Sequence, residues 1–534
     1  MSDQTDDGIV EEPAGTDGMN QVPPTGAPPG KDADGRSPTN IFTFPMTAIG
    51  GGMVLAGVVA FFVLMLIDLT SQTENPYRAI VTWLAIPAVI TLGLVIAVIG
   101  IVVRSRMARR RGESIRFLLR IEPSNPRYMR NLWLFLGLAA VLIVLVAYGG
   151  IRAYETTESV AFCGEACHEV MGPQNTTYLA SAHARVPCTE CHIGPGRSFW
   201  VKSKLDGIRQ VWKTMTNTFD RPIATPVTSL RPAQETCEHC HWPEQFYGQQ
   251  LVNLSYYRSD EANSPWTISL LVNVGGGNPR TGTAEGIHWH MITNNTIEYI
   301  AVDRDRQEIP WVRLNREDGT QVVYADPDAG IGPDSPGVEV RTFDCIDCHN
   351  RPSHTFEPPA TAINLRIAQG SISRDLPFIR RVGLDLLNAE YQTTPEANEA
   401  IPAGLVAFYA AEYPDDVEAF RADIDRAAEA LVKIYDGNFF PEMKTDYRVR
   451  VNNLSHFTND GCFRCHNTDL VSDQGIGIGT ACDTCHSIVA QGPSEDVNEL
   501  QSDLGGLEFE HPVDIGGVWD RIKCTQCHTP AQGY

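Results

Sequence analysis

Long apolar runs without charged residues mark the first 151 residues of this chain. Met46–Ile67, Ala79–Val103 and Leu132–Ile151 contain 22, 25 and 20 residues. A helix of about 20 apolar residues crosses the roughly 30 Å hydrocarbon core of a bilayer. A helix buried in a soluble core seldom runs this far without a charge. The pattern therefore predicts a three-helix transmembrane region, which we place at residues 41–151.

The segments around these runs predict an orientation in the membrane. Residues 1–40 hold eight acidic residues, two basic residues and six prolines, so we expect a disordered acidic tail. Residues 104–131 carry nine arginines, whereas residues 71–78 carry only Arg78. By the positive-inside rule the arginine-rich loop and the tail are cytoplasmic, and everything after Ile151 lies outside. This is typical of a bacterial inner-membrane protein with a large periplasmic region.

Beyond Ile151 the hydrophobic pattern changes between helix and strand periods. Gly196–Trp212 mixes apolar and basic side chains at helical spacing, as in a helix at a membrane interface or one that covers a core. Alternating β-branched residues predict a small β-rich insert at residues 250–340. Its expected strands are Thr267–Val274, Thr296–Val302, Ile309–Leu314 and Thr320–Tyr324. Helical periodicity then predicts helices at Ala360–Gln369, Pro377–Tyr391 and Asp415–Tyr435.

The cysteines carry the chemistry of the periplasmic region. All fourteen form pairs, and a histidine follows the second cysteine of every pair. Such a run is typical of covalent attachment of c-type haem, with two thioethers and the histidine as an axial ligand. Six pairs have two residues between the cysteines, and the first has three. The motifs are Cys163/Cys167/His168, Cys188/Cys191/His192, Cys237/Cys240/His241, Cys345/Cys348/His349, Cys462/Cys465/His466, Cys482/Cys485/His486 and Cys524/Cys527/His528.

Zinc ribbons are the alternative for paired cysteines, but zinc does not require a histidine after every second cysteine. We therefore predict seven covalently attached c-type haems. Residues 152–249 would hold haems 1–3, and residues 341–534 would hold haems 4–7. The predicted fold is a membrane-anchored multihaem cytochrome c with a mainly helical or irregular, haem-packed periplasmic region.

Low-spin haems need a sixth iron ligand, usually histidine or methionine. Seven histidines lie outside the ligand position of the motifs, and His239 lies within its own motif, where we do not expect it to bind another iron. The six remaining candidates are His183, His288, His290, His354, His456 and His511. Met171, three residues after His168, is the candidate for the seventh position. If His288 and His290 lie on a strand they point to opposite faces, which would leave one of them as a ligand.

The formal charge of −23 argues against a nucleic-acid partner and suits contact with basic proteins. The two motifs nearest the third apolar run would place the first haem at the depth of a quinol head group. Acidic residues throughout the chain would help to hold the cationic oxidised haems.

The segment Ser181-Ala-His183-Ala-Arg-Val-Pro-Cys188-Thr-Glu-Cys191-His192-Ile-Gly-Pro195, after a membrane anchor and a first motif with a nearby methionine, resembles the NapC/NirT/NrfH family of quinol dehydrogenases. The likeness covers roughly residues 130–245. Three spans and seven haems are more similar to the inner-membrane heptahaem cytochromes of metal-respiring bacteria. By this resemblance Met171 matches the family's first-haem methionine. His183 matches the histidine that binds a different, later haem.

The resemblance implies a quinol pocket with a lysine and an acidic residue on the helix after the second motif. Lys202 or Lys204 matches the lysine, and Asp206 or Gln210 takes the acidic position. The implied function is oxidation of quinol, which we expect to be menaquinol, with electrons passed to periplasmic cytochromes or other redox proteins. Simpler family members have one span, four haems and two residues between the first cysteines, which differs from this chain.

Two other functions remain open. The chain could be an electron-relay subunit of a larger respiratory complex, without a quinol site of its own, because three spans exceed the needs of an anchor. It could also be a terminal multihaem reductase of an oxyanion, which requires an iron with an open position. No motif replaces its histidine with lysine, a substitution found in some multihaem nitrite reductases.

Overall fold

A computed structural model describes residues 38–39, 44–70, 81–111, 114–115, 126–194, 197–227, 232–242, 246–275, 286–292, 295–454, 456–457 and 459–529. The chain divides into two compact units, Met1–Tyr154 and Glu155–Tyr534. The tail that we expect to be disordered lies outside the described residues, apart from Pro38–Thr39. That pair forms a short strand, β1, with Ser114–Ile115, which is β2.

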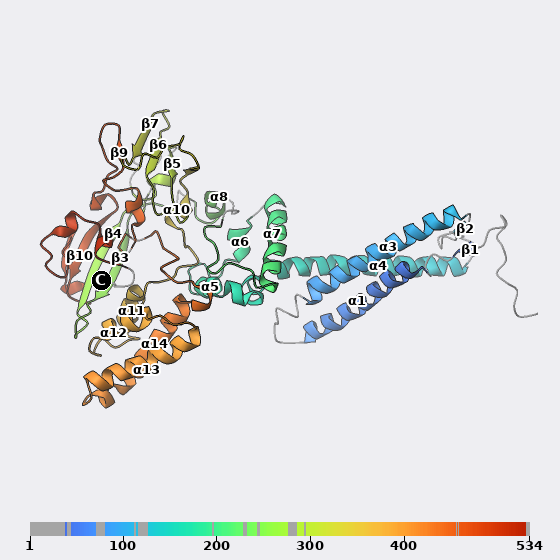
Figure 1. Ribbon diagram of the computed structural model, residues 1–534, viewed down its shortest axis with the longest axis horizontal. Helices are drawn as coiled ribbons and strands as arrows, with labels where there is room; N and C mark the ends of the chain where they lie inside the picture. The colour runs from blue at the N-terminus through green and yellow to red at the C-terminus, as the bar shows by residue number, and fades with distance from the viewer. Residues whose placement is uncertain are drawn as a thin grey trace, which may run out of the picture. The chain divides into compact units, whose positions relative to one another are not determined.

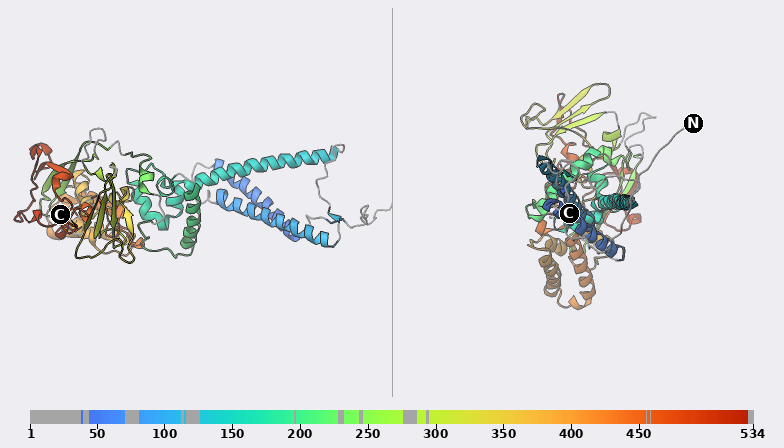
Figure 2. Two further views of the ribbon diagram at one scale, coloured as in Figure 1. Left: turned by 90° about the horizontal axis from the view of Figure 1, so that it is seen from above. Right: turned by 90° about the vertical axis from the view of Figure 1, so that its right-hand side faces the viewer.

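Long helices make up the first unit. They are α1 (Pro45–Thr70), α3 (Ile86–Arg110), which a π-helical turn at Val81–Ala85 precedes, and the first part of α4 (Pro126–Glu158). Helices α1 and α3 lie side by side (Figures 1 and 2). Glycines allow this close approach: a Cβ on Gly93 would lie 2.9 Å from the Gly50 carbonyl oxygen. Small residues at helix contacts are typical of packing within membranes.

Two helical stretches among the described residues are long and apolar enough to cross a membrane. They are Pro45–Ile67 and Val81–Arg110, which coincide with the first two predicted spans. The third apolar run, Leu132–Ile151, lies inside α4, and several of its side chains are outside the described part of the chain. The third span and the membrane orientation therefore remain predictions.

Short helices begin the second unit. They are the π-helical turn Ala161–Ala166, α5 (His168–Leu179), α6 (Cys188–His192), α7 (Arg197–Met215) and α8 (Ala233–Cys237). The amphipathic segment after the second motif is a helix, as its spacing predicts. The first three cysteine motifs lie within or beside these turns.

Two antiparallel sheets follow. One has the order β11-β10-β4-β3, from Gln501–Leu507, His486–Gly492, Pro265–Val272 and Gln250–Tyr257. The other has the order β8-β5-β6-β7-β9, from Val340–Thr342, Thr296–Ile300, Trp311–Asn315, Gln321–Ala325 and Val471–Ser472. The predicted strands are present. Three strands from beyond residue 470 complete the sheets, so residues 250–340 pair with the C-terminal region as well as with themselves.

Four helices without a haem motif form the main apolar core of the second unit. They are α11 (Pro359–Ala368), α12 (Ile379–Asn388), α13 (Thr394–Glu412) and α14 (Val417–Asn438), gathered together in Figure 1. Ile363, Leu387, Leu405 and Leu431 are fully buried between them. Three of the helices match predicted ranges, and α13 adds a fourth. This core supports the chain between the fourth and fifth motifs.

Candidate functional site

The cysteine motifs fold as single tight turns. In the fourth motif, which forms α10 (Cys345–Cys348), the His349 amide donates to the Cys345 carbonyl oxygen at 2.8 Å. The third, fifth and seventh motifs have the same hydrogen bond, at 2.7, 3.0 and 2.8 Å. Residues three and four apart lie on one side of such a turn. Both sulfurs and the imidazole of a motif can therefore reach one porphyrin.

The second cysteines of the second, third and seventh motifs lie at the surface. Cys191, Cys240 and Cys527 are exposed, whereas Cys348, which has the same position in the fourth motif, is partly buried. The amides of Cys240 and Cys527 donate to the carbonyl oxygens of Cys237 and Cys524 at 3.1 Å, which holds both residues in their turns. Haem attachment stays a prediction for all fourteen cysteines.

The first motif accommodates its extra residue in the π-helical turn Ala161–Ala166. A π-helix places one more residue in each turn than an α-helix, and single π-turns are frequent at functional sites. Gly164 is buried there, and a methyl group at this position would collide with the Asn175 side-chain amide. The insertion is thus absorbed locally, and α5 begins at His168 directly after Cys167.

Histidines from distant parts of the chain come together in pairs. Six motif histidines each face one of the six candidate distal histidines, with ring centres 5.9–6.3 Å apart. The pairs are His192–His354, His241–His183, His349–His288, His466–His290, His486–His456 and His528–His511. Two imidazoles bound to opposite sides of one metal through bonds of about 2 Å have ring centres about 6 Å apart. Each pair therefore has the spacing of two axial ligands.

This arrangement differs from a zinc ribbon. Within the described residues, no group of three or more histidine, cysteine, aspartate and glutamate side chains is placed to hold a metal ion. A tetrahedral zinc site needs such a group. Paired imidazoles beside a pair of thiols instead fit the donor set of c-type haem.

Backbone carbonyls orient five of the distal histidines. The Nδ1 atoms of His183, His288, His290, His354 and His511 lie 2.6–3.1 Å from the carbonyl oxygens of Pro352, Val274, Ile287, Gln174 and Val513. The Nδ1 atom of His511 also lies 3.2 Å from the Val513 amide, which only donates, so these contacts do not fix the His511 tautomer. At the other four histidines the carbonyl oxygen only accepts, so each Nδ1 carries the proton and donates. The lone pair of Nε2 is then available to a metal, as in most histidine–metal sites.

Burial keeps several of these rings neutral. It lowers the pKa of His354 to about 4, aided by the nearby His192. Burial also lowers the pKa of His192, His290 and His456 below the ordinary value. Only a neutral imidazole can bind a metal, so the protein supplies these side chains in the required state at neutral pH.

His288 and His290 do not lie on a strand. The segment forms a short helix, α9 (Trp289–Ile292), and both rings face a motif histidine. The opposite-face argument for a strand does not apply, because the chain turns tightly here. His239 is exposed, and no histidine ring pairs with it among the described side chains.

The first motif has a different environment. Met171 stands one helical turn after His168 on α5, and residues three apart share a face of a helix. The His168 side chain lies outside the described part of the structure. The iron ligands of the first motif, Met171 included, stay a prediction.

Motifs that follow one another in sequence are neighbours in space. The Cys163 thiol is hydrogen-bonded with Cys188, and Cys345 with Cys237. Charges on neighbouring motif cysteines also contribute to raised pKa values, after burial as the main cause. These electrostatic neighbours are Cys191 with Cys237 and Cys240, Cys348 with Cys462, Cys485 with Cys462, and Cys524 with Cys482. The seven motifs thus form one continuous series in chain order.

Of the four residues considered for a quinol pocket, Lys204 alone has a side-chain partner among the described residues. Its ammonium group forms an ion pair with Glu158, at the end of α4, and donates to Thr157 Oγ1 at 3.2 Å. Lys202, Asp206 and Gln210 make no side-chain hydrogen bond or ion pair with described residues. Asp206 lies about 200° around α7 from Lys204, so these two side chains do not share a side of the helix.

An apolar face of α7 is exposed. Leu205, Ile208, Trp212 and Met215 are 64–78% exposed and recur every three or four residues. A helix that covered a core would bury such a stripe. The exposed stripe, with Lys204 at its edge and Arg209 on the other side, is typical of a helix at a membrane surface.

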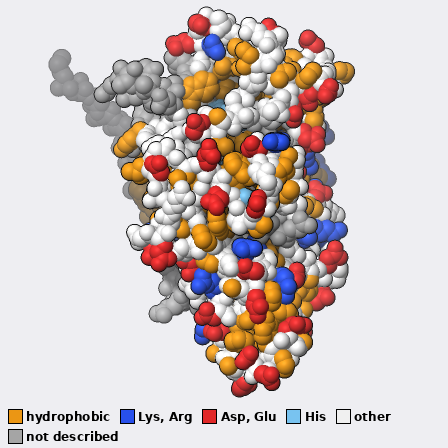
Figure 3. Space-filling view, turned by 90° about the vertical axis from the view of Figure 1, so that its left-hand side faces the viewer, with side chains coloured by type: hydrophobic (Ala, Val, Ile, Leu, Met, Phe, Trp, Pro, Cys, Tyr) orange, Lys and Arg blue, Asp and Glu red, His pale blue; other side chains and the backbone are white. Residues whose placement is uncertain are grey.

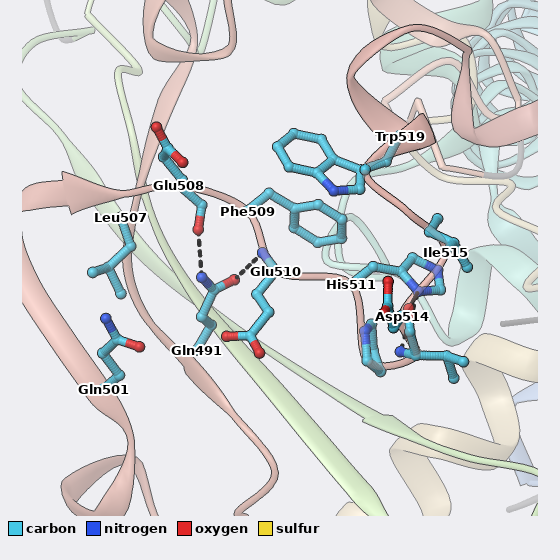
Figure 4. A pocket seen from close by; sticks show the side chains of 13 residues that line it. Gln491, Gln501, Leu507, Glu508, Phe509, Glu510, His511, Asp514, Ile515 and Trp519 are labelled. Carbon is cyan, nitrogen blue, oxygen red and sulfur yellow. Dashed lines mark hydrogen bonds between the residues drawn. The ribbon is translucent and has the colours of Figure 1, made fainter.

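A cleft of about 510 Å³ lies beside the last distal histidine (Figure 4). Phe509 and Trp519 pack edge to face next to His511, with ring centres 5.3 Å apart. Gln491 fixes the wall by donating to the Glu508 carbonyl oxygen and accepting from the Glu510 amide. On the face drawn in Figure 3, acidic side chains are spread among fewer basic ones. The cleft itself is lined by the carboxylates of Glu508, Glu510 and Asp514, and Cys527 of the seventh motif is exposed.

Paired histidines beside paired cysteines, in a chain with apolar membrane helices, define a membrane-anchored multihaem c-type cytochrome. The model of the N-terminal region of the NapC/NirT cytochrome c family matches residues 126–241. The chain is 37% identical over 498 residues to the cytochrome c-type protein ImcH of Geobacter sulfurreducens, which covers 93% of this chain and 95% of that protein. It therefore belongs to this family of multihaem inner-membrane cytochromes, which bind haem c covalently. No solved structure matches the chain.

Proposed function

We propose that this chain oxidises quinol at the periplasmic face of the inner membrane and passes the electrons through seven haems to periplasmic acceptors. The observation that carries the proposal is the continuous series of motifs, in which each is the spatial neighbour of the next. One end of the series follows the membrane helices in the chain. The other end lies at a solvent-accessible cleft.

The six histidine pairs would supply both axial ligands of haems 2–7. Bound haem irons supply one-electron redox chemistry. The protein holds each imidazole by a carbonyl or by burial, so that little rearrangement accompanies a change in iron charge. Cysteine neighbours such as Cys163 and Cys188 bring the attachment points of consecutive haems together, which favours transfer in chain order.

Three features support a quinol site at the first haem. The exposed apolar stripe of α7 suits contact with the bilayer surface. A third membrane span within α4 would place Glu158, at the end of that helix, near the same bilayer surface. Lys204 joins these two helices through its ion pair with Glu158. The NapC/NirT likeness covers this part of the chain, and quinol dehydrogenation is the activity that the family implies.

The acceptor would bind near the seventh motif. The cleft beside His511 and the carboxylates of Glu508, Glu510 and Asp514 in its lining suit a basic redox protein, such as a small periplasmic cytochrome. Electrostatic complementarity of this kind raises the rate of encounter and makes it dependent on ionic strength.

Stopped-flow mixing of the purified full-length holoprotein in lipid nanodiscs with a reduced menaquinol analogue tests the proposal. The haem absorption bands should change to those of the reduced protein during the stopped-flow trace. Lys204→Met should slow this reduction at least tenfold, whereas Lys202→Met, which changes a lysine two residues away, should change it less than threefold. Dithionite should reduce all haems in every variant.

Reduction by dithionite but not by quinol would instead support the electron-relay function. A terminal reductase is less favoured by the geometry, because it needs an open iron position and six motif histidines already face a second histidine. Only the first motif lacks a described partner ring. An oxidised spectrum with a high-spin component assigned to that haem would support the reductase function.

A further inference from the structure

The last turn of α4 presents a carboxylate to α7. Glu158 pairs with the ammonium group of Lys204, which also donates to the Thr157 hydroxyl at 3.2 Å. The Glu158 side chain is 14% exposed and that of Lys204 is 29% exposed, so the pair is largely shielded from water. Both residues nevertheless stay close to the surface on which the apolar stripe of α7 is exposed. A small molecule at that surface could reach the pair.

Glu158 also lies near the first haem-attachment point. The pKa of the Cys163 thiol is raised mainly by its hydrogen bond with Cys188 and by burial, and the charge of Glu158 adds to this effect. Coulombic interactions weaken with distance, so this contribution agrees with the short separation of Glu158 and Cys163 along the chain. Glu158 thus pairs with the lysine of the proposed quinol site and acts on a cysteine of the first motif.

Quinol oxidation requires a base at this point. Quinol releases two electrons and two protons when it becomes quinone. A base must lie within hydrogen-bond reach of the hydroxyl whose proton it takes. Asp206, on α7 itself, lies on a different side of the helix from Lys204, and Gln210 has no proton-accepting carboxylate. Glu158 is the carboxylate that the structure brings to Lys204.

We propose that Glu158 accepts the proton of quinol, while Lys204 holds both the carboxylate and the quinol oxygen. This inference rests on the proposed quinol dehydrogenase function. In each one-electron step an O–H bond of quinol breaks and its proton moves to the Glu158 carboxylate, and the first haem, which Cys163, Cys167 and His168 would hold, would supply the one-electron acceptor. The proton then leaves to periplasmic water, and the second step repeats the first. Among the described residues, Glu158 pairs with Lys204 of α7, which also donates to Thr157, and the charge of Glu158 acts on Cys163 of its own segment.

A pair of isosteric variants tests this role in the full-length holoprotein. Glu158→Gln keeps an oxygen that can accept from Lys204 but cannot take a proton. Glu165→Gln is the matched control, because Glu165 is exposed, lies between the cysteines of the same motif and carries the same charge. The readout is the rate of haem reduction by a menaquinol analogue at pH 7, with dithionite reduction and the visible spectrum measured on the same samples.

The expected result is a fall of about 100-fold in quinol-driven reduction for Glu158→Gln, the usual contribution of a general base. Glu165→Gln should remain within about threefold of the wild type. Spectra and dithionite reduction should be the same in all three proteins.

Two outcomes would overturn the inference, and they are distinguishable. If quinol reduces the wild type and Glu158→Gln at the same rate, Glu158 is not the base, although the quinol dehydrogenase function stands. If quinol does not reduce the wild type while dithionite does, the proposed function fails and the role of Glu158 fails with it. Equal slowing by Glu158→Gln and Glu165→Gln would show a general effect of charge, which also contradicts the inference.

Discussion

The imidazole rings of His288 and His349 lie parallel, with ring centres 6.3 Å apart and planes 4° from each other. His349 belongs to the fourth motif, whereas His288 precedes the short helix α9. The Nδ1 atom of His288 donates to the Val274 carbonyl oxygen at 2.6 Å, which fixes the ring from behind. Phe246 stacks on the same ring with centres 4.3 Å apart. The protein therefore sets the His288 ring independently of its motif partner.

Replacing His288 with alanine should leave the fourth haem without its second axial ligand. The other five candidate distal histidines each face a different motif histidine, so among the described residues none of them is placed to substitute for His288. The oxidised holoprotein should gain a high-spin ferric signal equivalent to about one haem, while the total haem content stays unchanged. Electron paramagnetic resonance and pyridine haemochrome quantification measure the two quantities.

The control for this prediction is His239→Ala. His239 is also a histidine close to haem motifs, but it is exposed and lies inside the third motif. This variant should keep the wild-type low-spin spectrum. A high-spin signal in His239→Ala, or an unchanged spectrum in His288→Ala, would contradict the proposed ligand pair.

The sequence was sufficient to find the ligand types but not their pairing. A C-x-x-C-H run is a local signal, so the motif residues and the remaining histidines could be selected by inspection. The partner of each motif histidine depends on long-range folding: His354 meets His192 and is oriented by Gln174, far away in sequence. The sequence pattern also did not predict the helix beside His288 and His290, because a helix of four residues, Trp289–Ile292, is too short to show helical periodicity.

The turn at Gly164 should be sensitive to an added methyl group. Gly164→Ala would force its new Cβ into the Asn175 amide, so we expect a loss of about 1–3 kcal/mol in stability. Disturbance of the π-helical turn should also lower the yield of haem at the first motif. Thermal unfolding and haem quantification by peptide mass spectrometry measure these effects.

Gly172→Ala is the matched control for Gly164→Ala. Gly172 lies inside α5, and nothing lies within 4 Å of a Cβ at that position. Alanine favours a helix over glycine by about 1 kcal/mol, so this variant should be as stable as the wild type or more stable. Equal behaviour of the two variants would show that the Asn175 contact does not matter.

The acidic partner of Lys204 was missed by sequence reasoning for a different reason. The family resemblance directed attention to α7, where Asp206 and Gln210 follow the lysine. Helix geometry separates Asp206 from Lys204, whereas folding brings Glu158 across from α4. The charged residue at the end of the third apolar run was visible in the sequence. Its contact with α7 was not, because nothing local links the two segments.

The carboxylate of Glu298 should stabilise the second sheet in a pH-dependent way. It accepts from Asn315 at 2.9 Å and from Arg313 at 2.8 Å, and these hydrogen bonds hold the pKa of Glu298 below its ordinary value. A lowered pKa means stabilisation that is complete above the ordinary value of about 4.3 and is lost as the pH falls through the folded-state pKa. Glu298→Gln should therefore weaken β5 and β6 by about 1–2 kcal/mol at pH 7, and much less at pH 3.

Hydrogen-exchange protection of the β5 and β6 amides, corrected for intrinsic exchange, measures this difference at each pH. Glu339→Gln is the control, because its ion pair with Arg341 is at the surface, where Glu339 is 76% exposed. Exposed pairs of this kind contribute little. If Glu298→Gln lowers the hydrogen-exchange protection of these amides equally at pH 7 and pH 3, the stabilisation by Glu298 is not electrostatic.

The position of the segment that carries the seventh motif should depend on one carboxylate, that of Asp460, which lies just before the fifth motif. Asp460 accepts from Lys523 at 2.7 Å and from the Thr525 hydroxyl at 2.8 Å, so it joins the approach to Cys462 with the turn that begins at Cys524. Burial alone would raise the pKa of Asp460, but these hydrogen bonds outweigh it and lower the pKa. Asp460→Ala should weaken this attachment by about 1–3 kcal/mol, because it leaves Lys523 and Thr525 without their acceptor.

The loss should appear as faster hydrogen exchange and earlier proteolytic cleavage near Cys524, with little change around α11–α14, which have a core of their own. Asp520→Ala removes a carboxylate from the same segment, but its ion pair with Arg521 is exposed and spans 3.5 Å. That variant should behave like the wild type. If both variants loosen the segment equally, net charge rather than the Asp460 hydrogen bonds holds it. A selective effect of Asp460→Ala would mean that the fifth motif positions the seventh, and electron transfer to a periplasmic acceptor should then fall in the same variant while quinol-driven reduction of the first haem does not.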